Sequence, residues 1–347
     1  MTAKELHFTR TNGPIDAAIE DLISLAGGIR HTDLVREMIL AALKAGQERQ
    51  ETADLKLMNT SLKEMRFTSK VFEPYKDVKK VSVFGSARTQ ADEPIYEMAR
   101  LFGERLAKQG CMVITGAGPG IMHAVNEGAG PEHSFGVNIR LPFEQKANPV
   151  MEGSPRVINY KYFFSRKVAF LKESDAVALF PGGFGTLDEA METLTLVQTG
   201  KHNPLPIVLI DEPGGSYWTE WRKFVERELL RPGYINPVDL SLFERATTVD
   251  DAVEKIIRFY RRYHSIRSIK DRLVIRLNTP IPAAQEAALK EDFGDILCPP
   301  HEFFFSDHAL AEEENEPEIF HLPRLILTFN RKEFGRLHQL IDRLNAL

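Results

Sequence analysis

Three glycine-rich turns stand out as candidate anion sites. They are GSAR at 85–88, TGAGPG at 115–120 and PGGFGT at 181–186. Glycine lets the backbone approach a ligand closely, and a helix that starts after such a turn offers free N–H groups and the positive end of its dipole. The turns therefore predict a phosphate site, with the candidate residues Ser86, Arg88, Gly116, Gly118, Gly120, Gly182, Gly183, Gly185 and Thr186.

Each turn alone is weak evidence, because a tight strand-to-helix connection also favours glycine. The GxGxxG pattern is absent, and no Gly-Lys-Ser/Thr follows GAGPG as in a P-loop. All three turns are nevertheless expected at the carboxyl ends of strands, where open α/β sheets bind their ligands. The set therefore favours one shared site over three unrelated turns.

Four charged residues near the third turn could act on a bound phosphate compound. Glu189 fits a capping box with Thr186, whereas Glu192 can share its helix face or lie in solvent. A carboxylate beside an anion is unfavourable unless it faces developing positive charge or orients water. Arg166 and Lys167 open the preceding helix, where cations suggest an anionic partner, although an ordinary surface pair remains an alternative.

An alternation of strands and helices must position these residues. Short apolar runs predict strands at 81–85, 112–116, 135–140, 176–181 and 206–211, and amphipathic patterns predict helices at 94–109, 120–129, 165–175 and 186–198. This order is typical of a parallel sheet with helices on both faces. With right-handed crossovers, the predicted fold class is α/β, a doubly wound Rossmann-like sheet.

Two accessory parts are predicted outside this alternation. We expect a helical N-terminal arm at 1–78, the Rossmann-like nucleotide-binding catalytic domain at 79–267 and a small βαβα unit at 268–347. The arm would serve packing or dimerisation. The C-terminal unit, with an acidic loop at 311–318 expected in solvent, could serve regulation or assembly or be only a packed extension.

Composition excludes several classes of protein. The 347 residues carry a net charge of −5, which gives no reason to expect nucleic acid or a membrane surface as partner. The two cysteines, Cys111 and Cys298, provide neither a disulfide framework nor a CxxC zinc site. The N-terminus lacks the apolar core of a secretory signal, and no run of 18 apolar residues exists. We therefore expect a cytoplasmic protein.

Together the motifs resemble the Lonely Guy (LOG) family, the cytokinin-activating phosphoribohydrolases that were long mislabelled lysine decarboxylases. The resemblance is carried by GSAR at 85–88, TGAGPGIM at 115–122, NIRLPFEQKAN at 138–148, FFSRK at 163–167 and PGGFGTLDE at 181–189. The last segment meets the family motif PGGxGTxxE at every fixed position. The resemblance spans about residues 79–230, and the LPFEQ stretch and the length look like the longer bacterial branch.

The resemblance implies hydrolysis of the N-glycosidic bond of a purine nucleoside 5′-monophosphate, either adenosine monophosphate (AMP) or an N6-modified AMP, as in an AMP nucleosidase. The products would be the free base and ribose 5-phosphate. It also implies that no metal or other cofactor is needed and that the chain forms a homodimer or a higher assembly of dimers. The choice among adenine, prenylated adenine and guanine stays open.

The resemblance also maps roles onto residues of this chain. Arg166 and Glu189 take the positions of the family's catalytic residues, and the phosphate-binding backbone maps onto Gly182, Gly183, Gly185 and Thr186. By analogy with glycoside hydrolases, Glu189 would stabilise an oxocarbenium-like sugar and activate water. Arg166 would hold phosphate or ribose and keep Glu189 ionised.

A non-catalytic carrier or sensor of nucleotides or cofactors on the same fold is the main alternative. Such proteins, including a molybdenum-cofactor carrier, share the glycine turns but need no Arg/Glu pair, so Arg166 with Glu189 favours an enzyme. An NAD-dependent oxidoreductase is disfavoured, because GxGxxG and a ribose-binding acid after the first turn are missing. No motif identifies the Schiff-base lysine that a pyridoxal-phosphate decarboxylase would ordinarily need.

Overall fold

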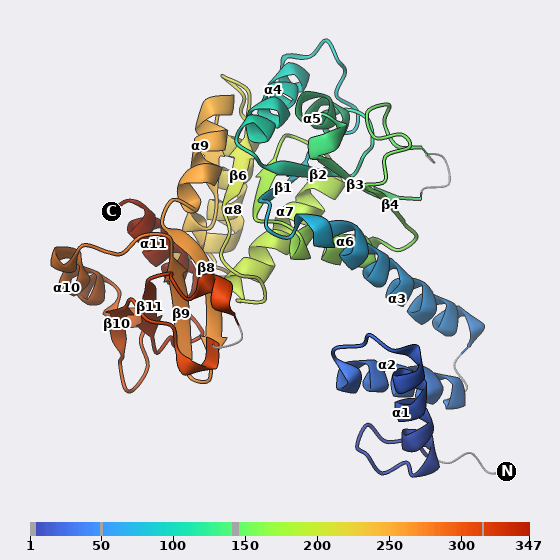
Figure 1. Ribbon diagram of the computed structural model, residues 1–347. Coiled ribbons are helices and arrows are strands. Elements are labelled where there is room, and N and C mark those ends of the chain that lie inside the picture. Colours follow the sequence, from blue (N-terminus) through green and yellow to red (C-terminus); the bar gives the residue numbers. More distant parts are fainter. Residues whose placement is uncertain (1–4, 49–50, 141–145, 314–315) are drawn as a thin grey trace. The chain divides into compact units, whose positions relative to one another are not determined.

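The computed structural model describes residues 5–48, 51–140, 146–313 and 316–347 (Figure 1). The chain divides into two compact units, Met1–Phe67 and Thr68–Leu347. The first contains helices α1 (Pro14–Ala26) and α2 (Thr32–Gln47) and most of α3 (Thr52–Phe72). Ile19, Ile23 and Leu40 form its small apolar core. None of the described helices is long and apolar enough to span a membrane.

The second unit is built on a seven-stranded parallel sheet of order β4-β3-β2-β1-β5-β6-β7. Its strands are β1 (Lys80–Phe84), β2 (Met112–Thr115), β3 (Ser134–Ile139), β4 (Val157–Tyr160), β5 (Ala176–Leu179), β6 (Ile207–Ile210) and β7 (Glu244–Ala246). Five of them coincide with the predicted apolar runs. The edge strands β4 and β7 were not predicted, because they are short and only partly apolar. The doubly wound α/β fold class is confirmed.

Helices cover both faces of this sheet. On one face lie α4 (Pro94–Lys108), α5 (Ile121–Ala129) and α9 (Val249–Phe259), and on the other α6 (Phe163–Lys172), α7 (Phe184–Gln198) and α8 (Tyr217–Val225). The short helices are η1 (Glu73–Tyr75), η2 (Pro131–His133), η3 (Glu226–Leu230) and η4 (Pro237–Ser241). Strand side chains alternate between the two apolar layers: Val81 and Val83 face α4, whereas Phe84 packs on Phe170 of α6.

The C-terminal part is an antiparallel four-stranded sheet of order β10-β11-β9-β8 (Figure 1, orange to red). Its elements are β8 (Tyr263–Ile269), β9 (Arg272–Leu277), α10 (Ala283–Asp292), η5 (Gly294–Ile296), β10 (Phe303–Ser306), η6 (Ala311–Glu313), η7 (Pro317–Ile319), β11 (Arg324–Leu327) and α11 (Phe334–Asn345). It therefore has two more strands than the expected βαβα unit, and the expected boundary at 267/268 falls inside β8. Phe259 of α9 belongs to the apolar core that packs beneath this sheet.

The expectation of a solvated acidic loop at 311–318 is wrong at Glu313. This side chain is fully buried, and its two oxygens accept hydrogen bonds from Arg276 and Arg324, each at 2.8 Å. The prediction rested on the acidic run alone. The two guanidinium groups that neutralise Glu313 come from β9 and β11, which are distant in sequence. Residues 314–315 of this loop lie outside the described residues.

Candidate functional site

The three glycine turns meet at the carboxyl edge of the parallel sheet, because they follow the neighbouring strands β2, β1 and β5. Two backbone hydrogen bonds join them. The N–H of Ser86 donates to the carbonyl of Pro181, and the N–H of Ile121 donates to the carbonyl of Ser86, both at 3.0 Å. The first turn therefore holds the second and third turns at a fixed spacing.

A cavity of about 810 Å³ opens where these turns meet. Ten predicted site residues line it: Ser86, Arg88, Gly116, Gly118, Arg166, Gly182, Gly183, Gly185, Thr186 and Glu189. The lining residues that had no predicted role are Phe84, Gly85, Ala87, Met122, Asn138, Ile139, Phe163, Phe184, Leu187 and Asp188. Several of these belong to the motifs that carry the family resemblance, and membership in those motifs could have identified them as site residues.

Three predicted site residues do not line this cavity. Gly120 is the last residue of the second turn and has a φ of 66°. A Cβ there would stand 2.3 Å from the carbonyl oxygen of Ser86, so a glycine is required where the first and second turns pack together. Lys167 and Glu192 line a separate groove of about 550 Å³ between α6 and α7.

Helix α7 begins at the third turn with Gly183 as its N-cap. Among the described residues, the N–H groups of Gly182, Gly183, Phe184 and Gly185 donate to no acceptor. These donors and the positive end of the helix dipole make this turn a suitable binding site for an anion. A Cβ at Gly183 or Gly185 would meet none of the described residues within 4 Å, which leaves space beside both for a ligand.

The expected capping box of Thr186 and Glu189 is wrong. The helix starts two residues before Thr186, and no side chain caps it. Thr186 therefore lies within the first turn of α7, and Glu189 lies farther along the helix. Gly183 is an accepted N-cap residue although it has no side-chain acceptor, so the helix can begin before Thr186. Glu189 is thus not occupied by helix capping.

Glu189 is a buried carboxylate whose nearest cation is Lys167. The Nζ atom of Lys167 lies 3.5 Å from Oε2 of Glu189 and 2.9 Å from Oδ2 of Asp188. Burial raises the pKa of Glu189, and the positive charges of Lys167 and then Arg166 oppose this rise. Burial lowers the pKa of Lys167, but its hydrogen bond with Asp188 and the charge of Glu189 leave it above its ordinary value.

Arg166 lies on the cavity side of the same helix. Its Nε donates to the carbonyl of Val137 at 3.0 Å, and its guanidinium lies against Gly116, where a Cβ would stand 2.8 Å from a terminal nitrogen. Arg166 thus spans from β3 to the second glycine turn. Lys167, rather than Arg166, makes the larger contribution to ionisation of Glu189.

Asn148 forms hydrogen bonds with the backbone of the second turn, and no role was predicted for it. Its main-chain N–H donates to the carbonyl of Ala117 at 2.7 Å, and its Nδ2 donates to the carbonyl of Gly118 at 3.1 Å. The same amide donates to Oδ1 of the buried Asn126, which also accepts the hydroxyl of Thr115. These bonds satisfy two carbonyls of the turn and fix the backbone there. Asn148 is the last residue of the NIRLPFEQKAN motif, and this motif was the only sequence signal for it.

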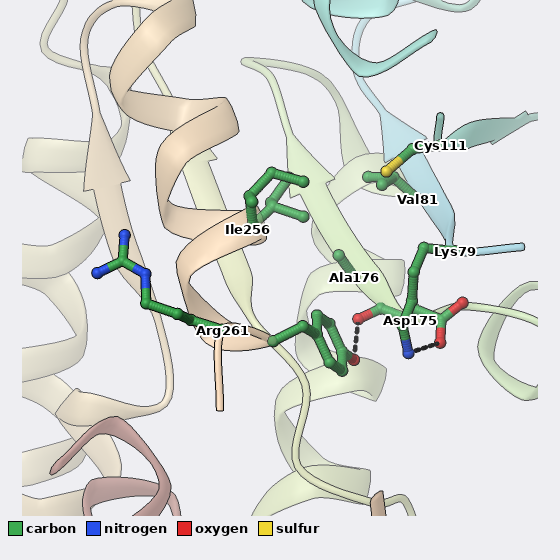
Figure 2. Close-up of a pocket in the computed structure, with 9 residues that line it drawn as sticks. Lys79, Val81, Cys111, Asp175, Ala176, Ile256 and Arg261 are labelled. Atoms are coloured by element: carbon green, nitrogen blue, oxygen red, sulfur yellow. Dashed lines mark hydrogen bonds and ion pairs between the residues drawn. The ribbon is translucent and has the colours of Figure 1, made fainter. Parts of the chain in front are cut away.

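A second, smaller cavity of about 220 Å³ lies at the opposite, amino edge of the sheet (Figure 2). It also contains charged and polar groups, but these already have partners: Arg261 pairs with Glu254 outside the cavity, and the others pair within it. Asp175 accepts from Lys79 at 3.0 Å and from the main-chain N–H of Lys80 at 2.9 Å, and the hydroxyl of Tyr260 donates to the carbonyl of Asp175 at 2.5 Å. The remaining lining is mostly apolar, with Cys111 at its edge.

Sequence comparisons confirm the resemblance to the LOG family. Residues 122–256 match the sequence model of a family described as possible lysine decarboxylase. The cytokinin riboside 5′-monophosphate phosphoribohydrolase LOG1 of Arabidopsis thaliana is 24% identical over 195 residues, which cover 55% of this chain and 89% of that protein. The probable phosphoribohydrolase LOGL5 of Oryza sativa is 28% identical over 183 residues, covering 50% of this chain and 70% of the relative.

Among solved structures, the X-ray structure of TM1055 is similar, with 25% identity, a TM-score of 0.39, and coverage of 52% of this chain and 99% of that one. The molybdenum cofactor carrier protein of Chlamydomonas reinhardtii matches with 21% identity and a TM-score of 0.37, over 52% of this chain and 98% of that protein.

Proposed function

We propose that this chain is an N-glycosyl hydrolase that cleaves purine nucleoside 5′-monophosphates, of the AMP nucleosidase type, into free base and ribose 5-phosphate. The observation that carries the proposal is one cavity that holds both an anion-binding turn and a buried carboxylate. Gly183 and Gly185 contribute open backbone donors, and Glu189 lies on the helix that begins at this turn. The similarity to phosphoribohydrolases of the LOG family supports it.

The phosphate is assigned to the third turn. The N–H groups from Gly182 to Gly185, which have no acceptor in the described part of the chain, and the N-terminus of α7 would supply hydrogen bonds and partial positive charge. Arg88 and Arg166 add two full positive charges to the same cavity. This binding energy, gained far from the bond to be broken, orients the sugar and lowers the barrier of the reaction.

The bond cleavage is assigned to Glu189. As the C1′–N9 bond breaks, the electron pair leaves with the purine and positive charge develops on the ribose, where a carboxylate stabilises it. Water then adds to C1′ and gives one proton to Glu189, and the departing purine takes up one proton from solvent. Glu189 releases its proton to solvent before the next turnover, so protons balance. Burial raises the pKa of this carboxylate, which makes it a better proton acceptor.

The base is assigned to the apolar part of the lining. Met122, Ile139, Phe163 and Leu187 provide apolar surface, and Asn138 provides the amide that could read a purine edge. The Nδ2 atom of Asn138 donates to Oδ1 of Asn159 at 3.1 Å, which fixes the orientation of this amide. A mixed lining of this kind is typical of pockets for small ligands.

Incubation with a panel of nucleoside monophosphates, with free base and ribose 5-phosphate measured, tests the proposal. We expect at least one purine monophosphate to be cleaved, and its unphosphorylated nucleoside to react about 100-fold or more slowly in kcat/KM, because truncated substrates lose orientation as well as affinity. Equal kcat/KM for nucleotide and nucleoside would contradict the phosphate assignment. Tight binding of nucleotides without any turnover would point to a carrier or sensor instead.

We further propose that the enzyme is a homodimer and acts in the cytoplasm. Aromatic and branched side chains are exposed beside the cavity and along α6, namely Phe163, Phe164, Val168 and Phe184, and a second copy of the chain would cover them. Both described cysteines are free thiols, as is usual in a reducing compartment. Sedimentation velocity of the purified protein tests the homodimer, which a monomer would contradict. Fractionation of native cells tests the location, which a secreted protein would contradict.

A further inference from the structure

Tyr217 contacts the third glycine turn but does not line the cavity of about 810 Å³. It is the first residue of α8, and its hydroxyl donates to the carbonyl oxygen of Gly182 at 2.7 Å. Its ring packs edge-on against the fully buried Trp218, with 4.8 Å between the ring centroids. The hydroxyl therefore approaches the turn from the side of the protein core, at a position fixed by packing.

This hydrogen bond determines the direction of the neighbouring amide. In a trans peptide, the carbonyl of Gly182 and the N–H of Gly183 point in opposite directions. Gly183 lines the cavity, and its N–H has no acceptor among the described residues. With its carbonyl held by Tyr217, this peptide presents the N–H as a donor on the side away from Tyr217.

A pair of glycines needs such a restraint. Gly182 and Gly183 have no side chains to restrict rotation of the peptide plane between them. If the plane rotated, the cavity would receive a carbonyl oxygen, which repels a phosphate. A restraint from outside the cavity keeps the donor in place before the ligand arrives, and such preorganisation strengthens electrostatic binding.

We propose that Tyr217 is a positioning residue for the phosphate, acting through the Gly182–Gly183 peptide. The inference rests on the proposed function, since it concerns the same phosphate site. A tyrosine hydroxyl is protonated at neutral pH and can donate, and burial raises the pKa of Tyr217 further.

The test is Tyr217→Phe, which removes the hydroxyl and retains the ring. Tyr234→Phe is the matched control, because Tyr234 is 76% exposed and does not line the cavity. The loss of one hydrogen bond predicts a rise in KM for the nucleoside monophosphate of about 3- to 10-fold. The inhibition constant of inorganic phosphate should rise by a similar factor, whereas inhibition by the unphosphorylated nucleoside should change by less than about twofold.

A purely structural role for Tyr217 would weaken phosphate and nucleoside binding alike, and that outcome would overturn the inference. It would also be wrong if Tyr217→Phe left KM and the phosphate inhibition constant at the values of wild type and Tyr234→Phe. In both cases the wild-type protein still cleaves nucleotide, so the proposed function stands. If the wild type neither cleaves nucleotide nor binds phosphate, the proposed function fails and this inference fails with it.

Discussion

The two edges of the parallel sheet carry similar residues and differ in how these are paired. At the amino edge, Lys79 and Asp175 form an ion pair, and Tyr260 donates to the backbone beside them (Figure 2). At the carboxyl edge, Lys167 pairs with Asp188 and Glu189, but the backbone donors of the third glycine turn have no acceptor among the described residues. Charged residues alone therefore do not distinguish a candidate site from a packed edge.

The difference follows from the direction of the helices. In a parallel α/β sheet, helices begin near the carboxyl ends of strands and end near the amino ends, so free N–H groups gather at one edge and free carbonyls at the other. Glycines prevent side chains from covering the donors at the carboxyl edge. We infer that backbone donors with no acceptor among the described residues and no side chain over them, rather than ionisable residues, distinguish the proposed binding edge of this molecule.

The largest expected effect comes from Glu189→Gln at the carboxyl edge. The amide keeps the size of the side chain but neither accepts a proton nor stabilises positive charge on the sugar. We expect kcat to fall by about 100- to 10,000-fold, the range of general acid–base contributions, with a much smaller change in KM. Steady-state kinetics with the best nucleoside monophosphate measures both.

Glu220→Gln is the matched control for this substitution, since Glu220 lies exposed on α8 and pairs with Lys223 at 2.8 Å. It should retain wild-type kinetics. Turnover of Glu189→Gln within about threefold of wild type would remove Glu189 from the mechanism. Loss of nucleotide binding together with turnover would instead indicate that Glu189 maintains the cavity.

A smaller effect is expected from Lys167→Met, which removes the nearest cation from Glu189. The pKa of Glu189 is already raised by burial, and Lys167 opposes that rise, so its removal raises the pKa further. Because the proposed mechanism needs the ionised carboxylate, activity falls as pH falls through this pKa. The acid limb of the kcat/KM profile should therefore move to higher pH, whereas Lys167→Arg, which retains the charge, should leave it near the wild-type position. An acid limb that stays in place in Lys167→Met would contradict this pairing.

Much of the parallel sheet could be predicted from the sequence because its strands are short apolar runs that end in glycine turns. The same local signal predicted that Gly116 and Gly183 belong to one site, whereas Arg166 was predicted from its place at the start of a helix and from the family resemblance; all three line one cavity. The antiparallel C-terminal sheet was harder to predict, since β8 and β10 mix polar and apolar residues and depend on pairing with β9 and β11. Their hydrogen bonds come from segments that are distant in sequence.

The residues that hold the turns could not be predicted for the same reason. Tyr217 and Gly182 are 35 positions apart, and Asn148 and Gly118 are 30 apart. No local pattern reveals such contacts. The burial of Glu313 between Arg276 and Arg324 is a further case, because an acidic run by itself suggests solvent. The residues that could do chemistry were therefore recognisable from the sequence. The hydrogen bonds that hold them in place could be identified only from the tertiary structure.

The smallest effect on turnover is expected at the amino edge, from Asp175→Asn. Asparagine can still accept from the N–H of Lys80, and the bond from Tyr260 goes to the backbone carbonyl, so the fold should persist. The ion pair with Lys79 is lost. Because the Lys79 side chain is 47% exposed, the free energy of unfolding should fall by only about 1 kcal/mol.

Urea unfolding measures this loss, and kinetics of the folded variant should give kcat and KM within about twofold of wild type. This outcome would support the view that the amino edge contributes stability, whereas the carboxyl edge contributes binding and catalysis. The opposite pattern, unchanged stability with a KM raised about tenfold or more, would mean that pairing at the amino edge controls the proposed nucleotide site through β1 and β5. The distinction between a paired and an unpaired edge would then be wrong, because both edges would belong to one functional unit.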